Sequence, residues 1–193
     1  MSDVSPLLNY VAKQLPLSKA ELDFFASLLR AKKIKRKQFL DQPGFVSRYR
    51  NYVVKGALRA YIVGDDGEEH TIGLAIENGF IGDHGSFLSQ EPATLFVEAI
   101  EDSEIIQMSH ENEQQLLEKV PKFHSYFRVK TLQVAVNIQK RVLSNISQSA
   151  EKRYKGFEKE YPQLLQRFPL YMIASYLGMT REFLSKIRNN RST

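Results

Sequence analysis

The residues best suited to chemistry lie near the end of the chain, where polar side chains alternate with apolar ones. The polar and charged positions are Thr180, Arg181, Glu182, Ser185, Lys186 and Asn189. The apolar positions fall where two short helices would bury their facing sides: Ile173, Leu177, Met179, Leu184 and Ile187. Gly178 stands between the two halves, where a tight turn needs a left-handed backbone that glycine adopts at low cost. This layout predicts a helix-turn-helix, whose second helix enters the DNA major groove.

A plain helical hairpin that completes a hydrophobic core is the alternative structure for residues 170–191. Such a hairpin needs the apolar spacing, but it needs neither a small residue where the helices approach nor a polar outer face. This stretch has both, with Ala174 at the approach and polar residues along the second helix. The combination favours the helix-turn-helix, although each feature alone would be weak evidence.

The net charge of the chain is concentrated in the segment that contains this motif. Residues 151–193 carry nine Lys or Arg against four Glu, which equals the whole net charge of +5 and leaves residues 1–150 balanced. Because clustered positive charge neutralises phosphates, this asymmetry predicts a DNA-binding segment joined to a neutral sensor or scaffold. A second basic cluster at residues 32–37 is expected to be the solvated end of a helix and the start of a strand, rather than a nucleic-acid patch.

Composition narrows the class of protein further. The chain of 193 residues has no cysteine, which excludes disulfides, thiolate zinc sites, iron–sulfur clusters and a cysteine nucleophile. Its N-terminus lacks a signal peptide pattern, and no stretch reaches the roughly eighteen apolar residues of a membrane span, so a cytoplasmic location without membrane contact is expected. The sequence contains no P-loop, HExxH, GxSxG or convincing carboxylate pair, so neither an enzymatic activity nor a cofactor is expected.

Apolar periodicity divides the chain into helical and β regions. Residues 5–30 carry helical signals, with Ser18 as the expected N-cap and Glu21 three residues later. From about residue 33 to residue 109, runs rich in Val, Ile, Phe and Tyr alternate with turn residues, which predicts a compact β-barrel or β-roll. The expected strands are 52–55, 57–63, 71–76, 95–99 and 104–108. Asp66-Gly67, between two alternating runs, predicts a hairpin.

A long helical segment is expected from about Ser109 to Ser147, with a break near Pro121. Within it, apolar residues follow alternating steps of three and four, interrupted only by Gln139: Val129, Leu132, Val136, Leu143 and Ile146. This spacing is typical of a helix that pairs with another helix, but a helix packed on its own β-domain has the same periodicity. We favour pairing between two copies, because helix-turn-helix proteins usually read paired half-sites as dimers. Ser149 is expected to cap a further helix.

This order of elements resembles the Crp/Fnr family of bacterial transcription regulators, in the branch common in Bacteroidetes. The likeness covers essentially the whole chain and is carried by Leu58–Asp83, Glu118–Arg153 and Pro169–Arg188. Stretches such as EKVPKF, SAEKRY and IASYLGMTREFLSKIR recur in that branch. The resemblance implies an α+β fold: an N-terminal double-stranded β-roll, a long central dimerisation helix and a C-terminal helix-turn-helix without a full wing. The corresponding domains are residues 1–120, 121–148 and 149–193.

In cyclic-nucleotide-binding members of that family, a GE turn and a following R-[ST]-A cradle the sugar-phosphate. The Glu binds the ribose and the Arg pairs with the phosphate. Here the turn contains Gly82, Asp83 and His84, and Ala93 followed by Thr94 stands at the arginine position. A methyl group cannot replace a charge-assisted contact with phosphate, and no other Lys or Arg lies between residues 82 and 106. Cyclic AMP is therefore not expected to bind at these five residues, and the effector, if one exists, is unknown.

Metal and haem sensing are not expected either. The four histidines show no paired ligand spacing, and each is expected to be a surface or hydrogen-bonded residue. They are His70, His84, His110 and His124. His84, in the turn that the resemblance points to, is the one to test first.

The second helix of the C-terminal motif matches the family pattern R-E-x-x-x-[RK] at residues 181–186. The resemblance implies that Arg181 donates to guanine and that Glu182 accepts from cytosine N4. Lys186 would reach a second guanine or a phosphate. An ordinary ion pair between Arg181 and Glu182 at the start of an exposed helix is the alternative reading of these two residues.

The remaining positions of this helix are assigned to the DNA backbone or to the motif's own core. Thr180, Ser185, Arg188 and Arg191 would contact phosphate or sugar. Phe183, Leu184 and Ile187 are expected in the core. Family members usually continue into a two-stranded wing, whereas few residues follow here. Further phosphate contacts are therefore expected from Lys152, Arg153, Lys155 and Arg167, and DNA binding is expected to be weaker or more salt-sensitive.

These observations predict a DNA-binding transcription regulator of the Crp/Fnr type that reads a two-fold site and does not respond to cyclic AMP. The alternative is a small-molecule or nucleotide sensor whose helix-turn-helix is vestigial. The expected partners are double-stranded DNA and a second copy of the chain. RNA polymerase and an unidentified small-molecule effector are further possible partners that the sequence leaves open.

Overall fold

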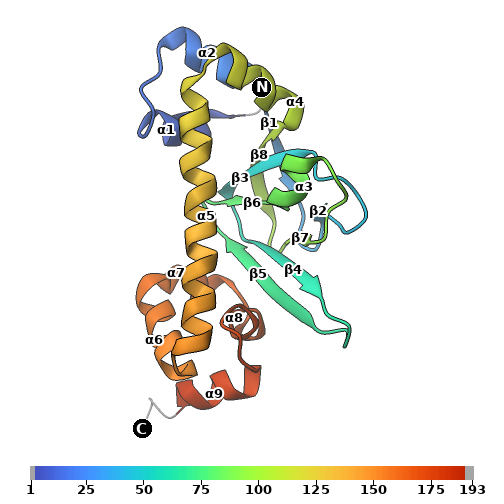
Figure 1. Ribbon diagram of the computed structural model, residues 1–193, viewed down its shortest axis with the longest axis vertical. Coiled ribbons are helices and arrows are strands. Elements are labelled where there is room, and N and C mark those ends of the chain that lie inside the picture. Colours follow the sequence, from blue (N-terminus) through green and yellow to red (C-terminus); the bar gives the residue numbers. More distant parts are fainter. Residues whose placement is uncertain (1–2, 190–193) are drawn as a thin grey trace. The chain divides into compact units, whose positions relative to one another are not determined.

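The computed structural model describes residues 3–189, which form two compact units (Figure 1). The first unit contains the described residues up to Ile62 together with Gly73–Val129. The second contains Val63–Ile72 and the described residues from Lys130 onward. Within residues 3–189, no helix has the length and apolar character needed to cross a membrane.

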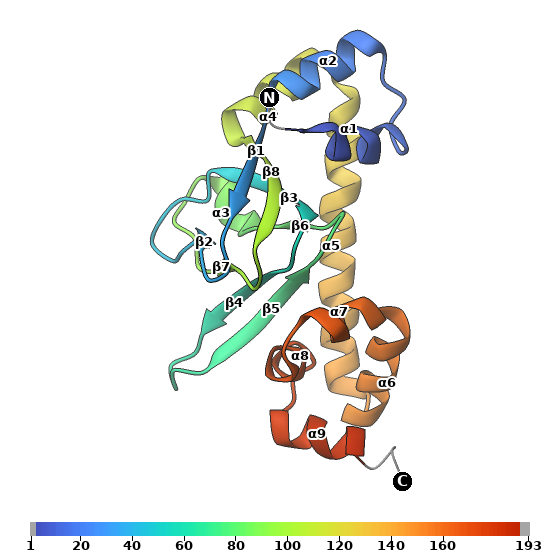
Figure 2. The ribbon, with the colours of Figure 1, turned by 180° about the vertical axis from the view of Figure 1, so that it is seen from behind.

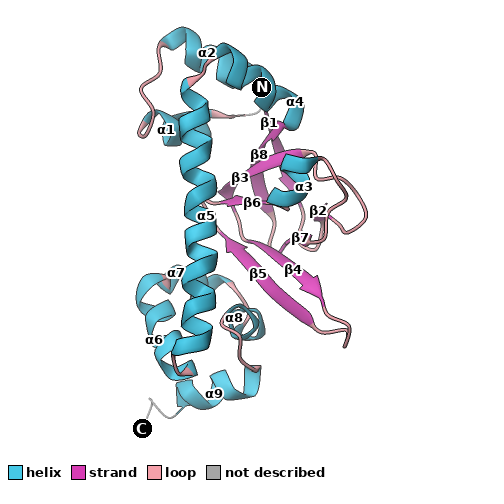
Figure 3. Ribbon diagram, viewed as in Figure 1, coloured by secondary structure: helices cyan, strands magenta, loops and turns pink. Residues whose placement is uncertain are grey.

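The first unit is built on a β-roll of two four-stranded sheets (Figure 3). Within the described residues, the strand order is β1-β8-β3-β6 in one sheet and β2-β7-β4-β5 in the other. The strands are β1 Leu29–Ile34, β2 Phe39–Asp41, β3 Tyr49–Lys55, β4 Leu58–Val63, β5 Glu69–Ala75, β6 Phe80–Ile81, β7 Phe96–Ala99 and β8 Ser103–Ser109. The pairs β1–β8, β3–β8, β3–β6, β2–β7 and β4–β7 are antiparallel. The predicted β-roll is confirmed, and its five predicted strands differ from the observed ones only by a few residues at their ends.

Runs of buried residues on strands of both sheets form the core of the roll. Val53, Leu58, Val97 and Ile105 are fully buried, and they come from both sheets. Such β-branched and branched side chains pack well on a pleated surface, which is why these runs read as strands in the sequence. Burying each of them contributes roughly 1.5–3 kcal/mol. The roll therefore gives a rigid frame for the turns between its strands.

Helices α1 (Ser5–Ala12), α2 (Lys19–Ser27) and α4 (His110–Lys119) surround the first turns of α5 (Lys122–Ser147), as both ribbon views show (Figures 1 and 2). They share a second core whose buried members include Val11, Phe25, Leu116 and Phe123. The Ser18 side chain accepts from Glu21 N, and the Glu21 carboxylate accepts from Ser18 N, which confirms the predicted capping box. Pro121 separates α4 from α5 as predicted, because proline lacks the N–H that a continuous helix needs.

The expected end of the N-terminal helical region at residue 30 was wrong. Leu29 was expected on a helix but opens strand β1, because its partner strand β8 supplies hydrogen bonds along the whole segment. The basic cluster at residues 32–37 is thus the end of this strand and a turn, not the end of a helix. Lys33 and Lys35 form exposed ion pairs with Glu104 and Asp102 at 3.3 and 2.7 Å.

The second unit is helical. It contains α5 from Lys130, then α6 Ala150–Glu160, α7 Pro162–Arg167, α8 Leu170–Tyr176 and α9 Arg181–Asn189. The Ser149 side chain accepts from Lys152 N, which confirms the predicted cap of α6. The buried side chains include Tyr154, Phe157, Phe168, Ile173 and Leu184.

The tip of the β4–β5 hairpin also belongs to the second unit, and side-chain hydrogen bonds show why. Ser175 Oγ of α8 accepts from Thr71 N at 2.8 Å and donates to Glu69 O at 3.0 Å. Arg141 of α5 donates from Nη1 to Ile72 O at 2.8 Å. The predicted Asp66-Gly67 turn is present, with Gly67 at φ +80°. The hairpin tip, residues 63–72, is therefore fastened to α5 and α8 within the second unit.

Candidate effector cassette and candidate nucleic-acid interface

The segment Gly82–Leu95, called the cassette below, joins β6 to β7 and contains helix α3 (His84–Ser89). It starts in close contact with β2 and β3. A Cβ added at Gly82 would lie 3.4 Å from Asp41 Oδ2 and 3.6 Å from Asn51 Nδ2. Asn51, which is 1% exposed, donates to Ile81 O at 3.2 Å and accepts from Gln107 Nε2 at 2.8 Å. The start of the cassette is thus fixed by buried polar groups of the roll.

Asp83 closes the cassette on itself. Its Oδ1 accepts from Ser86 N at 3.0 Å, and its Oδ2 accepts from Thr94 N at 2.8 Å, Thr94 Oγ1 at 3.2 Å and Leu95 N at 3.1 Å. The side chain thus caps α3 and also holds Thr94 and Leu95, at the far end of the cassette, next to its start. Burial alone would raise the pKa of Asp83, but these hydrogen bonds outweigh it and hold the pKa below its ordinary value. The carboxylate is therefore charged at neutral pH.

Asp41 of β2 contacts the start of the cassette, and its pKa is shifted in the opposite direction to that of Asp83. Its Oδ2 accepts from Asp83 N at 3.0 Å. Burial raises the pKa of Asp41, and the charge of Asp83 adds to the rise, against the lowering effect of the Asp83 N–H. Two neighbouring carboxylates are thus distinguished by the number of donors that each receives.

Ala93 is buried and contributes only its backbone. Its N–H donates to Phe45 O at 2.8 Å, and its carbonyl accepts from Gly44 N at 3.0 Å. At 4% exposure its methyl group leaves no charged side chain at this position. The structure therefore brings Gly82, Asp83, His84 and Thr94 into one cassette with Ala93, and two of these five residues, Asp83 and Thr94, are hydrogen-bonded to each other.

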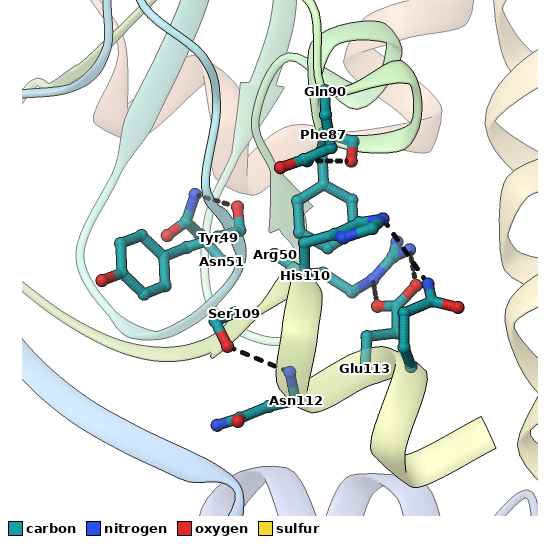
Figure 4. A network of polar contacts seen from close by, with 10 residues as sticks. Tyr49, Arg50, Asn51, Phe87, Gln90, Ser109, His110, Asn112 and Glu113 are labelled. Atoms are coloured by element: carbon teal, nitrogen blue, oxygen red, sulfur yellow. Dashed lines mark hydrogen bonds and ion pairs between the residues drawn. The ribbon is translucent and has the colours of Figure 1, made fainter. Parts of the chain in front are cut away.

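Arg50 connects the cassette helix to its surroundings (Figure 4). Its guanidinium donates to both carboxylate oxygens of Glu113, from Nε at 2.5 Å and from Nη2 at 2.8 Å. The same group lies 4.9 Å from the ring centre of Phe87 in α3 and 4.7 Å from that of Phe127 in α5. The Arg50 and Glu113 side chains are 9% and 4% exposed. This fully desolvated bidentate pair stacks between two aromatic rings, an arrangement that suits arginine and not lysine.

The sequence analysis missed Arg50, and no local signal could have found it. The pair joins β3 to α4 across 63 positions of the chain, and the two rings come from two further elements. A buried arginine and a buried glutamate look, in sequence, like any other charged residues. Only the packing of four elements reveals that they form one cluster.

His84 is half-buried beside this cluster. Burial and then the nearby Arg50 charge lower the pKa of His84, and the charges of Asp83 and Glu113 only partly oppose this. Its ring is therefore neutral at pH 7. Among the residues that the structure describes, no group of three or more His, Cys, Asp or Glu side chains could hold a metal ion.

The candidate nucleic-acid interface is formed by α8, α9 and the turn between them. Gly178 has φ +65°, the left-handed conformation that the sequence predicted at this turn. Leu184 and Ile187 are buried, as predicted. Phe183 is not: it is 48% exposed, which corrects its assignment to the core. Successive residues of an α-helix are rotated by about 100° around its axis. Leu184 and Ile187 therefore occupy the inner side of α9, and Phe183 lies beside that side.

The polar residues of α9 lie on the outside. Thr180, Arg181, Glu182, Lys186 and Arg188 are exposed, and Ser185 is half-buried. Thr180 Oγ1 accepts from Phe183 N at 3.2 Å, so that hydroxyl begins the helix. Within residues 3–189, the side chains of Arg181, Glu182 and Lys186 form no hydrogen bond or ion pair. No ion pair joins Arg181 to Glu182 within the described residues, and Arg191 lies outside them.

Two residues that were grouped with the expected phosphate contacts are used inside the unit instead. Arg153 donates to three backbone carbonyls: Leu177 O at 3.1 Å, Gly178 O at 3.3 Å and Gln148 O at 2.7 Å. It thereby clamps the turn between α8 and α9. Lys155 forms an ion pair with Glu151 at 2.7 Å. Arg188 borders a hollow of about 350 Å³ whose other walls come from α6, α7 and α8.

Comparisons with known proteins agree with this architecture. Residues 31–120 match the family described as "cyclic nucleotide-binding domain". No curated protein matches the sequence. One similar solved structure is the c-di-GMP-responsive global regulator CLP of Xanthomonas campestris, with 16% identity, a TM-score of 0.72 and coverage of 91% of this chain and 92% of that one.

Two further structures extend this likeness. FixK2 of Bradyrhizobium japonicum has 17% identity and a TM-score of 0.73, with coverage of 84% of this chain and 83% of that one. A CooA mutant from Carboxydothermus hydrogenoformans has 20% identity and a TM-score of 0.63, with coverage of 95% and 83%. Identities this low establish the fold and leave the function to be argued from the residues. The chain thus has the Crp/Fnr-like fold, and its residues 31–120 are similar to the cyclic nucleotide-binding domain family.

Proposed function

We propose that this protein is a dimeric DNA-binding transcription regulator that reads a two-fold site through α9. The observation that carries the proposal is the outer face of that helix, where Arg181, Glu182 and Lys186 are exposed and without partners among the described residues. Residues 1–120 would be the sensor-like domain, 121–148 the central helix and 149–193 the reading domain, with α8, the Gly178 turn and α9 as its helix-turn-helix.

The roles of the individual side chains follow from their chemistry. Arg181 presents two parallel donors, which suits the O6 and N7 acceptors of guanine, and Glu182 accepts from the N4 amino group of cytosine. Lys186, as a flexible point charge, suits a second guanine or a phosphate. Thr180, Ser185 and Arg188 would contact the sugar-phosphate backbone and fix the register of the helix.

A second copy of the chain would pair along α5. The residues of the predicted seam are at least 44% exposed: Val129, Leu132, Val136, Leu143 and Ile146. An apolar row of this length on one helix is costly in water and supports association with a like helix. A two-fold pair would set two copies of α9 about one DNA turn, roughly 34 Å, apart.

The cassette supports a regulator that does not respond to cyclic AMP. Ala93 offers no charge to a phosphate, and the donors of Thr94 and Leu95 are engaged by Asp83. The arginine that contacts the cassette, Arg50, is neutralised by Glu113. A cyclic phosphate entering the cassette would therefore meet carboxylates and no free cation.

The test is DNA binding as a function of salt. A preferred sequence is first selected from random duplexes, and its affinity is then measured by fluorescence anisotropy across a range of salt concentrations. We expect the logarithm of the binding constant to fall linearly with the logarithm of salt, because bound phosphates release counterions. Replacing Lys186 with alanine should weaken binding and, if it contacts phosphate, reduce the slope by about one.

The matched control is Lys19→Ala, which removes an exposed lysine from the first unit. It should leave both the affinity and the salt slope unchanged. Binding that is undetectable for every selected duplex, or that does not depend on salt, would refute the proposed function.

A further inference from the structure

Three hydrogen-bond donors at the end of the cassette converge on a single oxygen atom. Thr94 N, Thr94 Oγ1 and Leu95 N lie 2.8, 3.2 and 3.1 Å from Asp83 Oδ2. A neutral carbonyl in a loop is usually satisfied by one or two donors, whereas several donors on one oxygen are typical of a bound anion.

The anion present is the chain's own carboxylate. Asp83 is 6% exposed, so water contributes little to its solvation. Both of its oxygens are used, since Oδ1 accepts from Ser86 N at 3.0 Å. The hydrogen bonds keep the group charged despite its burial.

We propose that the Asp83 carboxylate is a built-in anion that occupies the place of an anionic ligand and keeps the cassette closed without any effector. An external phosphate or carboxylate would find the Thr94 and Leu95 donors taken. It would also face repulsion from Asp83 itself and from any ionised Asp41. The cassette therefore excludes anionic ligands, rather than merely lacking an arginine for them.

The hydrogen bonds of Asp83 that close the cassette are called the lock below. They also fix α3 against the first turns of α5. Asp83 caps α3, and Phe87 of α3 packs on the Arg50 guanidinium, whose other face meets Phe127 of α5. These contacts, with the two ring centres 4.9 and 4.7 Å from the same guanidinium carbon, connect Leu95 through α3 and Arg50 to α5 within the first unit. A cassette that is closed by its own residue would hold this path in one arrangement at all times. This regulatory consequence, unlike the lock itself, rests on the proposed function.

The decisive measurement is hydrogen exchange at the amides of Thr94 and Leu95, by NMR or by mass spectrometry of short peptides, in the full chain. Asp83→Asn keeps the size of the side chain but replaces the charged acceptor. We expect these amides to exchange at least about ten-fold faster in the variant, because its weaker acceptor no longer protects them. Asp23→Asn, at an exposed aspartate of α2, is the matched control and should change neither amide.

Inorganic phosphate is the probe for an open site. At constant ionic strength, millimolar phosphate should change neither the Tm nor the exchange of the two amides in the wild-type protein. Should phosphate protect them further, or should Asp83→Asn leave their exchange unchanged, the proposal is wrong. If Asp83→Asn does not fold, Thr94→Val serves instead: it removes one donor only, and Leu95 should remain protected and insensitive to phosphate.

None of these readouts involves DNA. If the protein does not bind DNA but its Thr94 and Leu95 amides are protected and insensitive to phosphate, the proposed function is wrong and the proposal about Asp83 holds. Exposed, phosphate-sensitive amides in a protein that binds DNA would overturn the lock alone.

Discussion

The cassette and the reading helix are both rich in polar side chains, yet they treat those groups in opposite ways. In the cassette, Asp83 receives four hydrogen bonds from the chain itself, and Arg50 beside it is paired through two nitrogens. On α9, the side chains of Arg181, Glu182 and Lys186 have no partner within the described residues.

Physical chemistry explains why the two arrangements can coexist in one chain. A buried polar group must be satisfied, because leaving it unpaired costs roughly 1–3 kcal/mol for a neutral group and more for a charged one. An exposed group is satisfied by water and stays available for a partner. The comparison teaches that the hydrogen-bonding groups of the cassette are satisfied without a ligand, whereas those of α9 gain partners other than water only when a ligand binds.

The largest expected effect comes from separating the two copies on which the reading helix depends. Leu143→Glu places a charge within the α5 seam, where two copies would bury it twice. We expect the mass in analytical ultracentrifugation to halve and the affinity for a two-fold DNA site to fall by about 100-fold or more. Asn137→Glu adds the same charge to the same helix away from the seam, and it should leave the mass unchanged. A monomeric wild-type protein would contradict the pairing.

Removing a single base-reading side chain should have the next largest effect. Arg181→Ala deletes an unpaired, exposed arginine, so it should leave the Tm unchanged while lowering DNA affinity by roughly 10- to 100-fold and relaxing the preference at one base pair. Arg48→Ala, at an exposed arginine of the first unit, is the matched control for lost charge. Equal affinity losses in both variants would mean that charge alone, and not base readout, drives binding.

Arg153 allows the comparison to be made within the second unit, because its guanidinium is engaged in hydrogen bonds, unlike the side chains of α9. Its guanidinium binds Leu177 O, Gly178 O and Gln148 O, and so holds the turn before α9. Arg153→Ala should destabilise the second unit by about 1.5–3 kcal/mol, as loss of charged hydrogen bonds does, and weaken DNA binding only several-fold through misplacement of α9. Arg153→Lys should rescue little, since an ammonium lacks the fork geometry.

The control for this variant is Lys152→Ala at the neighbouring exposed position. It should leave the Tm unchanged. An Arg153→Ala protein with normal thermal stability and a strongly reduced salt slope would show that Arg153 contacts phosphate after all.

The features that the sequence predicted are those encoded by neighbouring residues. Ser18 and Ser149 cap helices within four positions, and Gly178 takes the φ of +65° that its turn requires. The β-roll follows from alternating runs, and Pro121 breaks a helix for a reason internal to proline. Each of these depends on the local backbone, which a sequence pattern describes directly.

The features that the sequence did not predict depend on contacts between distant segments. Arg50 became part of a buried cluster only through three other elements, and Leu29 became a strand residue only because β8 lies beside it. Phe183 was placed in the core because aromatic residues usually are, yet two neighbours already filled that side of α9. Arg153 was taken for a phosphate ligand because its charge, and not its partners, is visible in sequence.

The smallest expected effect is a pH dependence confined to the cassette. The folded-state pKa of Asp83 lies below the ordinary value of about 3.9. Its contribution to stability is therefore fully present above that value and is lost as the pH falls through the folded-state pKa. Asp41 has a raised pKa, so its protonation in the same range favours the folded state and opposes the loss.

The difference in Tm between the wild type and Asp83→Asn should be constant from pH 7 to pH 5, at about 2–6 °C, and should shrink below about pH 4. Thermal unfolding followed by circular dichroism measures it, with Asp23→Asn as the control. A difference that grew on acidification would mean that Asp83 is not held as a charged group, and the cassette would then resemble the open reading helix more than its closed counterpart.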